Sequence, residues 1–321
     1  MVSLFTKVLP SAIVLGIGLW GVVLVSPSMA ESRSKIRVMT SIFPLQEFAK
    51  AVGGERAEVQ MLFSPGAEVH TSELKPSDVA KISRADIFIF IGPAMEPWAD
   101  KVLRAAQGKN LIVVEASGGL PFMEAFHGEG ERESHSHRHA HKEKMDPHIW
   151  LDFSLSLKIV DSVLSGFLKK DPNQAGYYQK NARAYKSNLI ELDKRYQRSL
   201  ASCRHRQIIL GGHAAFGYLA RRYGMEQTAL SGVSPHAEVT PRRMAEIIDY
   251  IKKSGLKYIF TEEMVHPKTS QALAKEAGVR VLILNPGGNL TADQSRQKMT
   301  FMDLMERNLQ NLQKGLECRN P

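Results

Sequence analysis

The sequence predicts an α/β protein with two lobes, each a mostly parallel sheet flanked by helices, joined by one long helix. Three observations predict this fold. Short apolar runs alternate with amphipathic segments from Lys35 onward. The runs at 86–92 and 111–116 are apolar almost throughout, as strands buried on both faces are. A long apolar stripe at 171–202 separates two halves that resemble each other in pattern. We expect an N-terminal lobe at 31–170, a linking helix at 171–202 and a C-terminal lobe at 203–321.

The first thirty residues predict a cleaved secretory signal peptide. Lys7 precedes an apolar stretch at 8–25, and small residues around Met29 favour cleavage after Ala30. The alternative is a retained membrane anchor, but the stretch is marginal in length for a span and no second one follows. The mature chain is therefore expected in a periplasm.

The N-terminal lobe begins with a strand at 36–41 and a helix at 44–54, whose apolar residues share one face. A second strand is predicted at 58–63. Ser77 is then expected to cap a helix that runs through Ile82. The two apolar runs named above complete the predicted sheet.

Residues 124–146 break this alternation. They have almost no apolar content, so they cannot bury a core, and we predict a surface loop. The long helix follows, with Asp171 as its cap, Pro172 in the first turn and Gln174 at capping-box spacing. Its apolar stripe consists of Tyr178, Ala182, Tyr185, Leu189, Leu192 and Tyr196.

The C-terminal lobe repeats the strand–helix alternation. Strands are predicted at 207–210, 257–262 and 279–284. Helices are predicted from Ala214 and after Pro267.

The composition argues against two classes of function. The formal charge is +9, and the first thirty residues hold one basic residue and no acid, which leaves 9 − 1 = +8 after cleavage. The basic residues are mixed with acids and not clustered with aromatics, so nucleic-acid binding is not expected. The chain also lacks a phosphate-binding loop and is not itself an ATPase.

The chain has two cysteines, Cys203 and Cys318. Two thiols in an exported protein favour one disulfide. The alternative is two buried free thiols. Two cysteines alone cannot form a four-ligand structural zinc site.

Four polar residues stand after apolar strands or at turns: His70, His148, His213 and Asn285. Ligands of α/β sheets bind at the carboxyl ends of the strands. Three imidazoles converging there would suit a tetrahedral zinc ion with one position left over. The histidines are far apart in sequence, so no compact motif links them, and an ordinary solvated or hydrogen-bonded histidine is the alternative for each.

The chain resembles the solute-binding proteins of zinc and manganese ABC transporters over nearly all of its mature length. The matching phrases include "SPGAEVHTSELKPSD", "DPHIWLDF", "GGHAAFGYLARRYG" and "YIFTEEMVHPKTSQALAKEAGVRVLIL". The resemblance implies that His70, His148 and His213 bind the metal. Manganese-selective members tend to carry Glu at the third position, so His213 favours zinc, in line with the preference of zinc for imidazole.

The resemblance leaves the fourth ligand open. Many members have Asp where this chain has Asn285 in "LNPGG", and a neutral amide is a weaker ligand. Water, Glu68 or Glu262 are the alternatives, although Glu262 is more readily interpreted as structural.

Zinc-selective members often carry a histidine-rich loop, and here the predicted loop contains His127, His135, His137, His139 and His141. We expect weak accessory zinc binding there. The alternative is a solvated linker.

The implied function is a monomeric periplasmic receptor. It captures Zn²⁺ between its lobes and delivers it to a membrane permease coupled to a cytoplasmic ATPase. The alternatives are a receptor for manganese or another divalent metal and, in a different class, a zinc-dependent hydrolase. No "HExxH" phrase supports the hydrolase.

Overall fold

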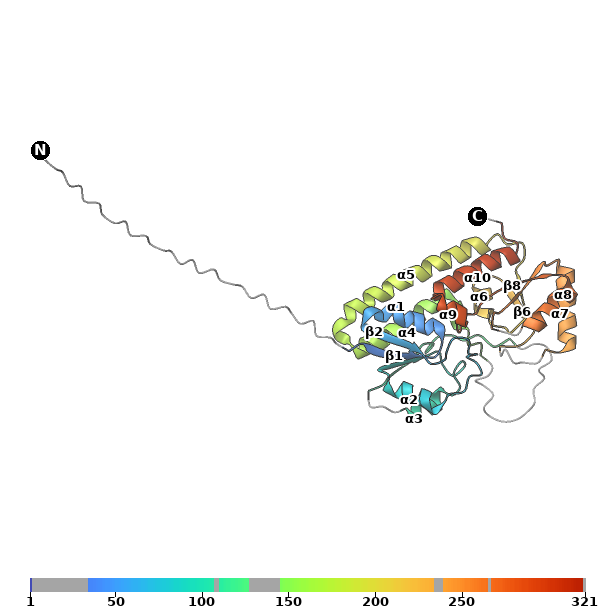
Figure 1. Cartoon of the computed structure of the whole chain (residues 1–321). Coiled ribbons are helices and arrows are strands. Elements are labelled where there is room, and N and C mark those ends of the chain that lie inside the picture. Colours follow the sequence, from blue (N-terminus) through green and yellow to red (C-terminus); the bar gives the residue numbers. More distant parts are fainter. Residues whose placement is uncertain (2–33, 107–109, 127–144, 234–238, 265–266, 320–321) are drawn as a thin grey trace. The chain divides into compact units, whose positions relative to one another are not determined.

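The computed structural model describes residues 1, 34–106, 110–126, 145–233, 239–264 and 267–319. Residues 35–321 form one compact unit. The described strands of this unit make two four-stranded sheets, and every strand pair is parallel. The predicted α/β class is therefore confirmed (Figure 1). The predicted division into domains at residues 30, 170 and 202 stays a prediction.

The two sheets have the same strand order. The first is ordered β2-β1-β3-β4 and the second β6-β5-β7-β8. The strands are β1 (Ile36–Thr40), β2 (Ala57–Met61), β3 (Ile87–Phe90), β4 (Ile112–Glu115), β5 (Gln207–Leu210), β6 (Glu226–Ala229), β7 (Tyr258–Thr261) and β8 (Arg280–Ile283). In each half the second strand pairs with one edge of the first strand, and the third strand pairs with the other edge. A crevice for a ligand is therefore expected beyond the carboxyl ends of β1 and β3, and of β5 and β7.

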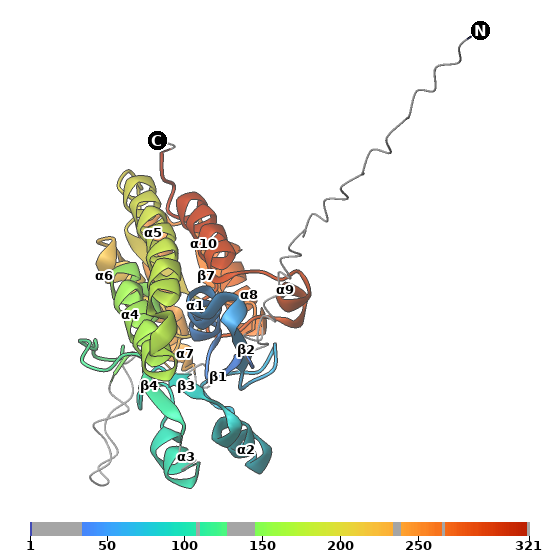
Figure 2. The same ribbon diagram turned by 90° about the vertical axis from the view of Figure 1, so that its left-hand side faces the viewer.

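The helices between these strands lie on both faces of the sheets (Figures 1 and 2). The α-helices are α1 (Phe43–Gly53), α2 (Pro76–Arg84), α3 (Ala99–Ala105), α4 (Phe153–Lys170), α5 (Ala175–Leu200), α6 (Gly217–Arg222), α7 (Pro241–Ser254), α8 (Pro267–Ala277), α9 (Ala292–Arg296) and α10 (Phe301–Gly315). Three short 3₁₀ turns are η1 (Gly54–Arg56), η2 (Ile149–Leu151) and η3 (Pro172–Gln174).

One apolar core spans both halves. Helix α5 packs against α1 and α4 of the first half and against α10 of the second (Figure 2). Buried side chains on either side of it, such as Phe48 and Phe260, belong to the same cluster. A smaller second cluster lies under α7 and α8. A core shared by both halves allows them to move little relative to each other, because close-packed interiors have low compressibility.

The long helix is present and its first turn begins at Pro172 as predicted, but the side chain of Asp171 does not cap it. The chain makes the 3₁₀ turn η3 first, and α5 begins at Ala175 with no side-chain cap. Asp171 is occupied elsewhere: its carboxylate accepts hydrogen bonds from the Tyr178 hydroxyl at 3.1 Å and from Arg56 at 3.3 Å. The predicted apolar stripe of α5 does face the core.

Two other helices begin at residues that differ from the prediction. Helix α2 begins at Pro76 rather than after Ser77, because proline suits the first turn and Asp78 accepts the N–H of Lys75. Helix α6 begins at Gly217 instead of Ala214. The N–H of Ala214 is directed to a carbonyl of the loop after β6, which keeps this stretch out of the helix.

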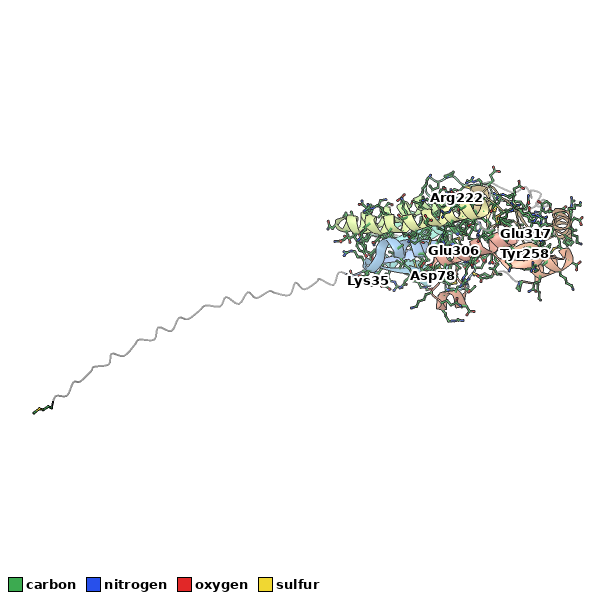
Figure 3. All side chains as sticks on the ribbon, turned by 90° about the horizontal axis from the view of Figure 1, so that it is seen from above. Lys35, Asp78, Arg222, Tyr258, Glu306 and Glu317 are labelled. Carbon is green, nitrogen blue, oxygen red and sulfur yellow. A yellow bond between two sulfur atoms is a disulfide. The ribbon has the colours of Figure 1, made fainter. Side chains whose placement is uncertain are left out.

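The two cysteines form a disulfide, so the first of the two alternatives is confirmed. The bond joins the segment before β5 to the end of the chain after α10. Glu317, which is next to Cys318 and is labelled in Figure 3, pairs with Lys257 at 2.6 Å. Within the described ranges, no helix combines the length and apolarity needed to cross a bilayer.

Candidate metal centre

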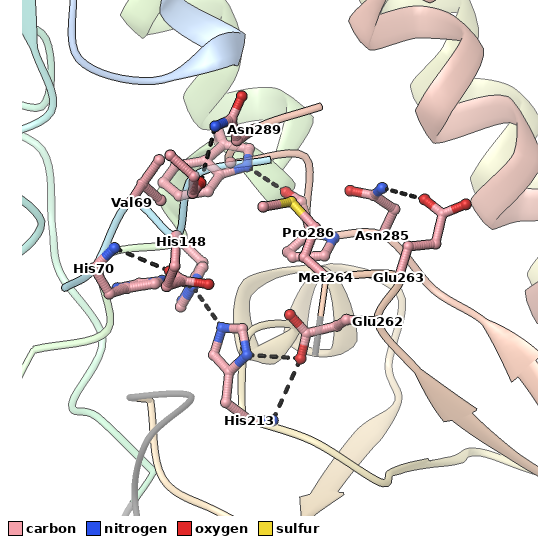
Figure 4. A pocket seen from close by; sticks show the side chains of 14 residues that line it. Val69, His70, His148, His213, Glu262, Glu263, Met264, Asn285, Pro286 and Asn289 are labelled. Atoms are coloured by element: carbon pink, nitrogen blue, oxygen red, sulfur yellow. Dashed lines mark hydrogen bonds and ion pairs between the residues drawn. The ribbon is translucent and has the colours of Figure 1, made fainter. Parts of the chain in front are cut away.

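The imidazoles of His70, His148 and His213 meet at one point (Figure 4). The Nε2 atom of His148 lies 3.2 Å from Nε2 of His70 and 3.2 Å from Nε2 of His213. Tetrahedral zinc, with Zn–N bonds of about 2.05 Å, requires ligand nitrogens about 3.3 Å apart. These two spacings suit one shared ion, and the ligand nitrogens of all three histidines lie within 4.8 Å of one another.

The three histidines come from separate parts of the fold. His70 lies in the irregular loop between β2 and α2, and His148 directly precedes η2. His213 follows β5 at the switch point of the second sheet. His148 and His213 are 1% and 2% exposed, whereas His70 is half-buried. The pocket is therefore open to solvent on the His70 side more than on the others.

Asp146 fixes the orientation of His148. The Nδ1 atom of His148 is 2.7 Å from Oδ1 of Asp146, and the same oxygen accepts the backbone N–H of His148 at 2.9 Å. With its proton on Nδ1, the imidazole directs the Nε2 lone pair at the other two rings. This is the arrangement in which a carboxylate orients a metal-binding histidine.

Glu262 does the same for His213. Its Oε1 atom lies 2.6 Å from Nδ1 of His213. Glu262 directly follows β7, the strand beside β5, so the two residues meet where the sheet order reverses. When both rings are neutral with their protons on Nδ1, the Nε2 lone pairs of His148 and His213 face each other at 3.2 Å. Such an approach is repulsive unless a metal ion or a shared proton lies between them.

Burial and nearby charge set the protonation of these groups. Burial, aided by the charge of His213, lowers the pKa of His148 well below its usual 6.5. Burial also acts to lower the pKa of His213, but the charge and hydrogen bond of Glu262 outweigh it and raise that pKa. Burial raises the pKa of Asp146 to about 7. His148 is thus held neutral, the state in which an imidazole binds metal.

The candidate fourth ligands line the same pocket but are engaged elsewhere. Glu68 accepts the backbone N–H of His70 at 3.0 Å, and Glu262 is bonded to His213. The amide of Asn285 donates to Glu263 at 2.7 Å and accepts the N–H of Gly287 at 2.7 Å (Figure 4). Among the described histidines, cysteines and carboxylates, the group close enough to share an ion consists of the three histidines.

The predicted accessory histidines, at positions 127, 135, 137, 139 and 141, lie outside the described residues, so weak zinc binding there stays a prediction. The described residues on either side are held together. Glu124 and Met145 form an isolated antiparallel bridge, and Asp146 donates its N–H to the carbonyl of Met123 at 2.9 Å. These two contacts stand directly before His148 in the sequence.

Sequence reasoning missed Asp146 as a partner of the site. The signal was available, because a carboxylate two residues before a histidine can accept that residue's backbone N–H. The hydrogen bond of Trp150 left no such local signal. The Trp150 indole donates to the carbonyl of Pro286 at 2.7 Å, across 136 residues of sequence.

Comparison with known families gives one match over most of the chain. The family described as zinc-uptake complex component A, periplasmic (ZnuA), matches residues 38–315. The high-affinity zinc uptake system protein ZnuA of Bacillus subtilis (strain 168) is 34% identical over 282 residues, which cover 88% of each chain. The zinc-binding lipoprotein AdcA of Streptococcus pneumoniae (strain R6) is 34% identical over 291 residues.

The AdcA match covers 91% of this chain but 58% of AdcA, so the chain spans little more than half the length of that relative. Solved structures agree with the sequence matches. The Zn(II)-bound ZnuA-like domain of Streptococcus pneumoniae AdcA is 33% identical, with a TM-score of 0.74 over 88% of this chain and 100% of that domain. A zinc-bound ZnuA deletion mutant is 25% identical, with a TM-score of 0.75 over 90% of this chain.

Proposed function

The chain belongs to the family of periplasmic zinc-uptake complex component A proteins, and we propose that it captures Zn²⁺ for delivery to a membrane permease. One observation carries the proposal: three imidazole nitrogens lie within 4.8 Å of one another, and the two most buried rings are each oriented by a carboxylate. Zinc is the cargo of such a site, not a resident cofactor.

The chemistry of the donors favours zinc over manganese. Imidazole nitrogens suit zinc, whereas manganese prefers carboxylate, carbonyl and water oxygens. The carboxylates nearest the rings, Asp146 and Glu262, are bonded to Nδ1 atoms and supply charge without supplying a ligand. Water takes the fourth position, because Asn285 is committed to Glu263 and Gly287. The manganese and hydrolase alternatives are not favoured.

The remaining parts of the proposal concern location and partners. Residues 1–30 direct export and are removed, which places the mature chain in the periplasm. There it acts as a monomer and passes zinc to an ABC permease coupled to a cytoplasmic ATPase. The family description, which includes the word periplasmic, supports this location.

The proposal is tested by zinc titration of the mature chain, from residue 31 onward, with a competing chelator. We expect one tight zinc ion per chain and much weaker manganese binding. Growth in zinc-poor medium should fail when the gene is deleted and recover when zinc is added. Absence of a tight zinc phase would refute the proposal.

The carboxylate partner of His213 gives a second test. We expect Glu262→Gln to weaken zinc binding by about 10- to 100-fold, because loss of an outer partner costs that much in metal sites. The amide removes a negative charge 2.6 Å from Nδ1 of His213 and no longer favours one tautomer. Chelator competition measures the change.

The neighbouring residue supplies a matched control. Glu263 also lines the pocket, but its carboxylate bonds to Asn285 and Gln294 and, among the described contacts, to none of the three clustered histidines. Glu263→Gln should therefore leave zinc affinity within about threefold of the native value. Equal losses in the two variants would mean that general charge, and not the orientation of His213, accounts for the effect.

A further inference from the structure

A short segment of the C-terminal half lies directly against both loops that carry zinc ligands from the N-terminal half. This segment, Pro286–Leu290, follows β8, and its residues Pro286, Gly288 and Asn289 line the pocket (Figure 4). Its Pro286 carbonyl accepts the Trp150 indole N–H at 2.7 Å, next to the His148 turn. Its Gly288 carbonyl accepts the N–H of Phe43 at 2.9 Å.

The contacts of this segment with the His70 loop are made chiefly by Asn289. The Asn289 carboxamide donates to two backbone carbonyls of that loop, those of Ser64 and Ala67, both at 2.9 Å. The N–H of Gly66 in turn donates to the carbonyl of Leu290 at 2.7 Å. Asn289 is 4% exposed, and its own Oδ1 accepts the N–H of Leu290. Both donor hydrogens of the amide are therefore used on the loop.

The His70 loop needs such external partners. Residues 62–75 form neither helix nor strand, so no regular ladder satisfies their backbone groups. Ala67, one of the two residues held by Asn289, stands three residues before His70. Because the loop is fixed at this point, the His70 imidazole has little freedom to move. Less conformational entropy is then lost when the metal binds.

We infer that Asn289 is a positioning residue for the zinc site: its side chain holds the His70 loop in the conformation that binds metal. The inference rests on the proposed function, since it assigns Asn289 a role in zinc capture and release. It also gives the "LNPGGNL" phrase a function separate from that of a metal ligand at Asn285.

A double-mutant cycle tests the inference. Asn289→Ala should weaken zinc binding roughly tenfold and speed zinc release to a chelator, because two buried hydrogen bonds to the loop are lost. In a His70→Ala background the same change should alter the remaining affinity by less than about twofold, because the ligand through which Asn289 acts is already absent. Equal losses in both backgrounds, or no loss in the native background, would overturn the inference.

A matched control separates this role from general destabilisation. Asn181 on α5 donates to the carbonyl of Val52 at 3.1 Å and does not line the pocket. Asn181→Ala should leave zinc affinity unchanged in both backgrounds. Asn289→Ser, a milder change, should give an intermediate loss and serves as the test if Asn289→Ala does not fold.

Hydrogen exchange of the zinc-free chain tests the contact independently of zinc. Amides of residues 66–70 should exchange faster in Asn289→Ala than in the native chain, and Asn181→Ala should not change them. Unchanged exchange would overturn the inference. If the native chain bound no zinc tightly, the proposed function would fail, while the exchange result would still decide whether Asn289 holds the loop.

Discussion

His148→Ala is expected to weaken zinc binding by about 100-fold or more. His148 is the central residue of the proposed site, since its Nε2 lies 3.2 Å from Nε2 of each of the other two histidines. Zinc sites with four protein ligands bind with apparent free energies of about 10–16 kcal/mol, or about 3 kcal/mol for each ligand, which corresponds to roughly 100-fold. Competition with a chelator of known affinity measures the loss.

His205 provides the control for this prediction. It is a largely buried histidine, 9% exposed, but it lies near Glu317 and outside the cluster of three. His205→Ala should bind zinc as the native chain does. Native-like zinc affinity in His148→Ala would remove His148 from the site and, with it, the proposed arrangement of ligands.

The parts of the fold that could be predicted from the sequence are those encoded by neighbouring residues. The run predicted as a buried strand at 86–92 contains β3, and all four residues of Ile87–Phe90 are buried. The apolar stripe of α5 is also encoded by residues close together in sequence, and it packs against the core as expected. These elements were predictable because burial determines which positions in the sequence are apolar and at what spacing they recur.

Helix starts were less predictable, because capping side chains can be claimed by distant partners. Asp171 has the sequence features of a cap, yet it bonds to Arg56, which lies 115 residues earlier. The whole of α4 was overlooked, although Asp152 does cap it by accepting the N–H of Ser154. Local propensity names candidates for a cap, and tertiary contacts decide among them.

The site shows the same limit more sharply. The loop position of His70 and the strand-end position of His213 are visible in the sequence, but convergence over separations of 78 and 65 residues is not. Resemblance to a family supplied that step. Asn289 escaped notice because its partners lie more than 220 residues away. Glu262, in contrast, was expected to be structural, and its bond to His213 agrees with a supporting role.

The second large effect concerns stability. Replacing both cysteines, as Cys203→Ser with Cys318→Ser, should lower the free energy of unfolding by about 4–5 kcal/mol. The disulfide closes a loop with a sequence separation of 115 residues. Such a cross-link removes much of the conformational freedom of the unfolded chain, and the chain-entropy model gives roughly this value for a loop of that length.

Denaturant unfolding of the native chain with and without a reductant, and of the double variant, measures this effect. Reductant should lower the unfolding midpoint of the native chain to that of the double variant and leave the variant unchanged. A loss below about 1 kcal/mol would mean that the unfolded chain is already constrained without the cross-link. Zinc affinity measured well below the unfolding transition should not change, because neither cysteine lines the pocket. The loop closed by the disulfide contains His213, Glu262 and Asn289. Loss of the disulfide should therefore reduce zinc binding only under conditions in which this part of the chain begins to unfold.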